Sequence, residues 1–117
     1  MDGGSEFRLE RAADGGTTTI RVAGDVDLSS VPKFEDALAA ALQSGGQDVA
    51  IDLGQVTYFG SEGVRALVDA IGVAGAAGTR LEVVDASMIA RRVLHVVGLD
   101  HVLRGDGSGP TAGAGGA

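Results

Sequence analysis

The chain has 117 residues, of which 44% are hydrophobic and 3% aromatic, and its 16 acidic and 9 basic side chains give a net charge of −7. This length and hydrophobic content suit one domain with an aliphatic core. The negative surface disfavours direct binding to nucleic acid or to an anionic membrane, because both present phosphate groups. The absence of cysteine excludes disulfides, thiol catalysis and cysteine-ligated metal sites.

The charge and hydropathy also indicate a partner type and a location. A basic protein surface is the kind of partner that a net negative charge favours, since opposite charges speed encounter. No apolar run is long enough to span a membrane, and the first residues are acidic and glycine-rich, unlike a signal peptide. The expected location is the cytoplasm.

The two ends of the chain differ in composition from its middle. Residues 105–117, GDGSGPTAGAGGA, contain almost nothing that could be buried in a core. The sequence therefore predicts one domain over residues 1–104, with a loose start at residues 1–5, and a flexible tail over residues 105–117.

Within the domain, the hydrophobic pattern alternates between the two-residue period of strands and the 3.6-residue period of helices. Residues 14–16 are typical of a hairpin turn, and residues 24–28 are expected to leave the second strand as a loop. The expected elements are strands at 6–13 and 17–23, a helix at 32–44, a strand at 48–53, a helix at 61–77, a strand at 80–85, a helix at 87–97 and a candidate final strand at 102–103.

The helices carry recognisable ends and apolar stripes. Ser29 or Ser30 lies near the expected cap of the first helix, and Gly98 is a C-cap for the third, with Leu99 packing back over its last turn. The predicted inward stripes are Phe34, Leu38, Ala41 and Leu42 in the first helix, Val64, Leu67, Val68 and Ile71 in the second, and Ile89, Val93, Val96 and Val97 in the third.

The order of these elements predicts the fold class. Strands that alternate with helices imply parallel pairs joined by crossover connections, and the opening hairpin makes the sheet mixed. We expect an α/β domain with a mixed sheet of four to five strands and three helices mainly on one face.

The most informative local pattern is a serine between two glycines, Gly60-Ser61-Glu62-Gly63, where a strand pattern gives way to a helical one. This places Ser61 on the surface at the start of a helix. A serine hydroxyl there can cap the helix, attack a substrate or carry a phosphate.

The nucleophile hypothesis has little support. The hydrolase turn needs glycine two residues before and two after the serine, and Phe59 occupies the first of these positions. A catalytic triad would also need a histidine, and the chain has only His95 and His101. The same scarcity of histidine, together with the lack of cysteine, leaves no candidate metal site.

A helix cap and a phosphorylation site remain open on local chemistry. Serine is a favoured N-cap residue, although Val64 prevents the reciprocal capping box. A phosphate at the same place would meet free backbone N–H groups and would change the exposed charge without requiring the domain to unfold.

Four segments follow one another in an informative order and spacing. They are Gly24-Asp25-Val26-Asp27, the strand and turn at residues 49–59, Gly60-Ser61-Glu62-Gly63, and residues 92–99 ending in Gly98-Leu99. Together they resemble a STAS domain, specifically a bacterial anti-sigma factor antagonist, over residues 7–103.

The resemblance implies a non-enzymatic protein without cofactor or metal that binds an anti-sigma factor, a kinase of the histidine-kinase-like ATPase fold, and thereby releases a sigma factor. The kinase phosphorylates the serine and breaks the complex, and a serine phosphatase resets it. By alignment Ser61 is the acceptor, and Asp25 and Asp27 face a basic patch on the partner. The implied partner-binding residues are Asp25, Asp27, Ser29, Gly60, Ser61, Glu62 and Gly63.

Two residues depart from the family pattern. Gly60 stands where the family usually has Asp, and Glu62 stands where it usually has Ser or Thr. Glu62 places a permanent negative charge beside the acceptor. These departures keep an alternative open, in which the domain is a structural partner in a lipid- or anion-transport complex without a phospho-switch.

Overall fold

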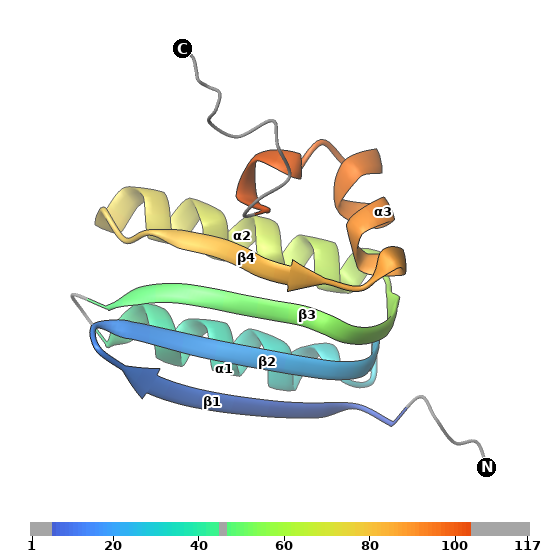
Figure 1. Cartoon of the computed structure of the whole chain (residues 1–117), viewed down its shortest axis with the longest axis horizontal. Helices are drawn as coiled ribbons and strands as arrows, with labels where there is room; N and C mark the ends of the chain where they lie inside the picture. The colour runs from blue at the N-terminus through green and yellow to red at the C-terminus, as the bar shows by residue number, and fades with distance from the viewer. Residues whose placement is uncertain (1–5, 45–46, 104–117) are drawn as a thin grey trace.

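Four strands form one mixed sheet in the order β1-β2-β3-β4, as Figure 1 shows. The computed structural model describes residues 6–44 and 47–103. β1 (Arg8–Asp14) is antiparallel to β2 (Thr17–Val26), whereas β2, β3 (Asp48–Phe59) and β4 (Leu81–Ala86) are parallel. The expected α/β fold with a mixed four-stranded sheet and three helices is confirmed.

The opening hairpin is closed by two glycines. Asp14 pairs with Thr17, so that only Gly15 and Gly16 form the loop, with φ values of 58° and 87°. Positive φ at both central residues is the requirement of the tight turn that matches the twist of a hairpin. The predicted turn is therefore confirmed at these residues.

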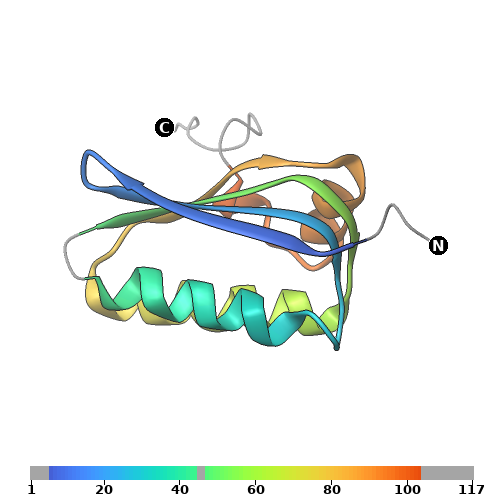
Figure 2. The same cartoon turned by 90° about the horizontal axis from the view of Figure 1, so that it is seen from below.

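Two helices lie side by side on one face of the sheet, α1 (Val31–Gln43) and α2 (Ser61–Ala77), as Figure 2 shows. Their apolar stripes and the inward faces of the strands form the core. Phe34 of α1 and Phe59 of β3 pack edge to face, with ring centroids 6.3 Å apart. The largest fully buried side chains are Ile20, Val22, Val26, Phe34, Val49, Ile51, Leu53, Leu67, Val83 and Leu94.

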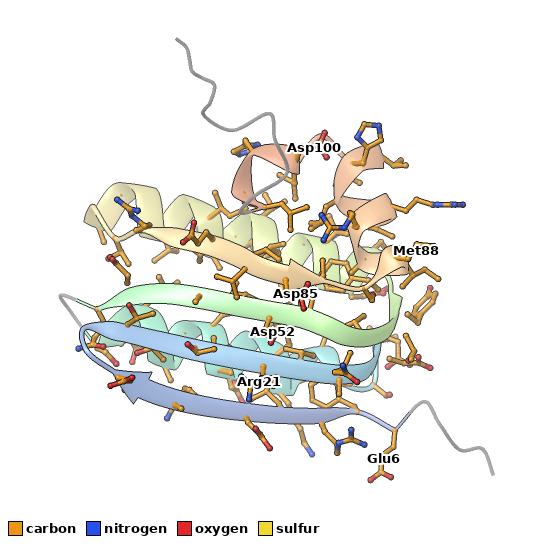
Figure 3. All side chains as sticks on the ribbon, viewed as in Figure 1. Glu6, Arg21, Asp52, Asp85, Met88 and Asp100 are labelled. Atoms are coloured by element: carbon orange, nitrogen blue, oxygen red, sulfur yellow. The ribbon has the colours of Figure 1, made fainter. Side chains whose placement is uncertain are left out.

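The opposite face of the sheet is polar. Arg21 of β2 donates to Asp52 of β3 over 3.3 Å and lies 3.7 Å from Glu10 of β1. Figure 3 shows Arg21, Asp52 and Asp85 on this face, one on each of the three parallel strands. Surface ion pairs of this kind contribute at most about 1 kcal/mol, so the apolar core on the other face supplies most of the stabilisation.

Two predicted strands end later in the structure than expected. β2 continues through Gly24, Asp25 and Val26, which were assigned to a loop, and β3 continues to Phe59 instead of ending at Leu53. The pairing of β2 with β3 shifts register twice, between Arg21 and Ala23 and between Gly24 and Asp25. Such irregularities let a glycine and charged residues remain within a strand.

The third helix, α3 (Met88–Val96), packs against β3 and β4, and its predicted stripe is wrong. Ala90 and Leu94 are the buried residues of this helix, whereas Val96 of the predicted stripe is 75% exposed. Met88, which was not part of the stripe, is 82% exposed. Of the remaining predicted stripe residues, Val93 is half-buried and Ile89 and Val97 are exposed; in α2, Val68 is likewise exposed.

The ends of α3 match their sequence signals. The Ser87 hydroxyl accepts from the Ala90 N–H over 3.1 Å. Gly98 has φ of 80°, and the Leu99 N–H donates to the Leu94 carbonyl over 2.8 Å, which is the expected glycine C-cap. After it, η2 (Asp100–Val102) and a single bridge from Leu103 to Val83 replace the candidate final strand.

The predicted tail at 105–117 and the loose start at 1–5 lie outside the described residues, so the domain boundaries stay a prediction. Among the residues that are described, no helix combines the length and hydrophobicity needed to span a bilayer.

Candidate functional site

The candidate site lies at the edge of the sheet where the parallel strands β2 and β3 end. Val26 ends β2 and Phe59 ends β3, and these two residues are paired. The Gly60 N–H donates to the Val26 carbonyl over 2.9 Å, so the turn into α2 is tied directly to the end of β2. The topology thereby brings the 24–30 segment beside Ser61, more than 30 residues later in the chain.

Ser61 is the first residue of α2 and is exposed. The N-cap is Gly60, with φ −82° and ψ 177°, and no side chain caps the helix. Within the described residues the Ser61 hydroxyl makes no hydrogen bond. The N-cap interpretation of Ser61 is therefore wrong, and its hydroxyl is available for other chemistry.

Asp27 organises the loop between β2 and α1. One carboxylate oxygen accepts from the Ser29 N–H over 3.0 Å, from the Ser29 hydroxyl over 2.8 Å and from the Ser30 N–H over 3.2 Å. These hydrogen bonds, with that from the Ser29 hydroxyl the largest, hold the pKa of Asp27 below its usual value of 3.8. Asp27 and Ser29 thus form a preformed turn beside the start of α1.

Protonation of Asp27 should loosen this turn in acid. A carboxyl whose pKa is lower in the folded state stabilises that state above its unfolded value, and the stabilisation is lost as pH falls through the folded pKa. We expect the Asp27 carboxyl to titrate below pH 3.8, with the Ser29 and Ser30 amide resonances moving at the same midpoint in an NMR titration. Asp27→Asn should remove that midpoint, and a wild-type midpoint at or above the ordinary Asp value would contradict the proposed turn.

Ser30, which was expected near the cap of α1, also connects the two aspartates. Its buried hydroxyl donates to the Asp25 carbonyl over 2.8 Å and accepts from the Asp27 N–H over 3.0 Å. The spacing of Asp27 two and three residues before two serines is the signal that could have indicated this turn.

Asp25 links the two strands at the same edge. Its carboxylate accepts from the Thr57 hydroxyl of β3 over 2.6 Å. The side chain is half-buried. Asp25 therefore fixes the position of the site as well as contributing charge to it, and its role toward a partner stays a prediction.

The two departures from the family pattern meet in space. A Cβ at residue 60 would lie 3.0 Å from the Tyr58 ring and 3.2 Å from Glu62 Oε1. Glu62 therefore turns its carboxylate back over Gly60, where an aspartate at position 60 would begin its side chain. Glu62 thereby supplies to this turn the negative charge that an aspartate at residue 60 would carry.

Gly63 allows α2 to approach the sheet. It is buried, and a Cβ on it would lie 2.8 Å from Val26 Cγ1 and 2.9 Å from Phe59 Cε1. Both distances are shorter than carbon–carbon contacts allow. Gly63 is thus part of the support beneath Ser61, and it has no side chain to offer a partner.

Beside Ser61 the surface is hollowed. The hollow has a volume of about 320 Å³ and is lined by Leu28, Val31, Glu35, Ser61, Glu62 and Arg65. Leu28 is 72% exposed at its rim, and Tyr58, which lies over Gly60, is 51% exposed. Exposed apolar side chains next to polar ones are typical of a protein-binding surface.

Among the described residues, no histidine lines this hollow. Across residues 6–44 and 47–103 no group of three His, Asp or Glu side chains could hold a metal ion. His95 Nδ1 lies 2.9 Å from Asp100 Oδ2 at the end of α3, and neither residue lines the hollow beside Ser61.

The fold and this site define a small α/β binding domain with an exposed serine at a strand-to-helix turn. The family model described as "Mlab, STAS domain" matches residues 9–105. The chain therefore belongs to the STAS domain family.

Similar proteins include anti-sigma factor antagonists. The chain is 27% identical over 89 residues to the anti-sigma-F factor antagonist RsfB of Mycobacterium tuberculosis, covering 76% of this chain and 72% of RsfB. The crystal structure of an anti-sigma factor antagonist from Mycobacterium paratuberculosis superposes with a TM-score of 0.77 at 25% identity, covering 89% of this chain and 88% of that one. Unphosphorylated SpoIIAA, at 21% identity, shares the fold with a TM-score of 0.70 over 84% of this chain and 85% of its own.

RsfB and the Mycobacterium paratuberculosis protein are both named as anti-sigma factor antagonists. The comparisons confirm the predicted family.

Proposed function

We propose that this protein is an anti-sigma factor antagonist whose binding is controlled by phosphorylation of Ser61. The observation that carries the proposal is the exposed hydroxyl of Ser61, which makes no hydrogen bond within the described residues and lies in a hollow beside the exposed side chain of Leu28. The names of its relatives support the same function.

The partner would be an anti-sigma factor of the histidine-kinase-like ATPase fold. It would dock on the surface formed by Asp25, Asp27, Ser29 and the turn at residues 60–63, and its release from a sigma factor would follow by competition. A net charge of −7 suits a partner with a basic contact surface. The function places the protein in the cytoplasm, with its sigma factor.

Phosphorylation would act on the docked surface directly. Transfer of the γ-phosphoryl group of ATP to Ser61 forms the Oγ–P bond, breaks the bond from Pγ to the ADP oxygen and releases the hydroxyl proton. The product adds roughly −1.5 to −2 charge beside Glu62 at pH 7. An apolar partner surface packed on the hollow would meet both bulk and an unpaired charge, and a serine phosphatase would reverse the change.

The first experiment is a paired pull-down from lysate of the native host, with wild type, Ser61→Ala and Ser61→Asp as baits. We expect wild type and Ser61→Ala to retain an ATPase-fold anti-sigma factor, and Ser61→Asp to retain at least about tenfold less of it, because a charge buried against an apolar contact costs more than about 1.4 kcal/mol. Equal retention by Ser61→Ala and Ser61→Asp would remove Ser61 from the mechanism.

A second candidate function rests on Gly60 and Glu62. Glu62 already places a carboxylate over the turn, as a constitutive negative charge next to Ser61. The domain could then be a structural partner in a lipid- or anion-transport complex, without a phospho-switch. Recovery of a transporter ATPase by all three baits would favour this function.

A further inference from the structure

Arg65 is the one cation among the six residues that line the hollow beside Ser61. It lies four residues after Ser61 on α2, so both side chains project from the same side of the helix. No carboxylate of the described residues lies within 4.0 Å of its guanidinium nitrogens. Its charge is thus not engaged in an ion pair with that part of the chain.

Glu62 is the neighbour that could have formed an ion pair with Arg65, since residues three apart on a helix also face each other. The Glu62 carboxylate instead lies over Gly60, 3.2 Å from where a Cβ at that residue would be. The hollow between Ser61, Arg65 and Leu28 therefore stays open, with a volume of about 320 Å³.

We propose that Arg65 holds the phosphate of phosphorylated Ser61, so that the phosphate folds into the hollow beside Leu28. An anion followed by a cation four residues later is the favourable order for a pair on a helix. Guanidinium also presents two parallel N–H donors that match phosphate oxygens. The phosphate would then occupy the space beside Leu28 that a partner side chain needs.

This inference rests on the proposed phosphorylation of Ser61 and deepens it. Glu35 of α1 and Glu62 of α2 are among the residues that line the same hollow, and Asp27 lies in the loop that also holds Leu28. All three disfavour the dianionic form of a phosphate there. Arg65 would offset these negative charges. Its removal should therefore change the pKa of the phosphate.

The experiment uses the full chain with phosphoserine encoded at position 61, and needs neither kinase nor partner. A ³¹P NMR titration measures the second ionisation of the phosphate, which for an ordinary phosphoserine has a pKa of about 6. We expect Arg65→Gln to raise this pKa by at least about half a unit relative to the unsubstituted chain, because a cation within reach favours the dianion. Arg65→Lys should raise it less.

Arg91→Gln, on α3 and away from the hollow, is the matched control and should leave the phosphate pKa unchanged. Circular dichroism would show that each variant is folded. A phosphate pKa that Arg65→Gln also leaves unchanged would overturn the proposed contact. That result would leave the proposed function intact. Equal partner binding by Ser61→Ala and Ser61→Asp would contradict the proposed function and would not bear on the contact between Arg65 and the phosphate.

Discussion

Gly24→Ala is expected to lower the free energy of unfolding by about 3 kcal/mol or more, from the combined cost of a left-handed backbone and of overpacking. Gly24 has φ of 87°, a conformation that side chains disfavour. A Cβ there would also overlap the Glu6 carbonyl oxygen and lie 2.9 Å from the Phe7 Cα. These are backbone atoms, and no rotamer change can relieve the overlap. Thermal unfolding should show a midpoint lowered by more than about 12 °C.

Gly78→Ala is the matched control for this effect. Gly78 has a similar φ of 72°, but no atom of the described residues lies within 4 Å of where its Cβ would be. Its substitution should cost about 1–2 kcal/mol, the backbone part alone. If Gly24→Ala and Gly78→Ala were equally destabilising, the N-terminal segment would not pack over Gly24. Figure 3 shows Glu6 at the end of the sheet where Met88 also lies, which is the end that carries the site.

Gly63→Val is expected to cost about 3 kcal/mol, at the upper end of usual overpacking. Its Cβ would press on Val26 and Phe59, which are 0% and 4% exposed and have no free space to enter. The start of α2 would have to move away from the sheet, carrying Ser61 with it. Chemical denaturation measures the stability loss, and loss of the Gly60–Val26 hydrogen bond would be visible as faster amide exchange at Gly60.

Gly72→Val, in the same helix, tests whether the effect belongs to the position or to the residue type. In the part of the chain that the structure describes, nothing lies within 4 Å of a Cβ at Gly72. Valine has a somewhat better helix propensity than glycine, so this variant should be neutral or slightly stabilising. A comparable loss of stability in both variants would show that close packing beneath Ser61 is not what requires glycine at residue 63.

Much of the fold was predictable because its signals are local. The bounds of α2 coincide with the predicted helix at 61–77, and the cap of α3 at Ser87 and its end at Gly98 follow known terminal patterns. The bounds of β2 and β3 were wrong where their continuation depends on pairing with each other across a register shift. Strand pairing depends on two segments that are distant in the sequence. The pattern within either segment alone therefore does not predict where the strand ends.

The stripe of α3 was wrong for a related reason. The pattern predicted an apolar face at Ile89, Val93, Val96 and Val97, but packing buries Ala90 and Leu94, and of the predicted residues only Val93 packs against the core. A nine-residue helix permits several phases of the 3.6-residue period. Tertiary contact decides among them.

The candidate site was likewise predictable only in part. The exposed position of Ser61 follows from the change of period along the chain, and the structure agrees. The connecting role of Ser30 and the return of the Glu62 carboxylate over Gly60 depend on side-chain directions that the sequence does not specify.

The hydrogen bonds from Gly60 to Val26 and from Thr57 to Asp25 have a kinetic consequence. They join both halves of the site before any partner arrives, so docking requires little ordering of loops and loses little conformational entropy. Rigid docking of this kind proceeds at about 10⁵–10⁷ M⁻¹s⁻¹ without a conformational step. In the proposed function, phosphorylation fills part of this surface without moving its backbone, and it should change chiefly the residence time of the complex.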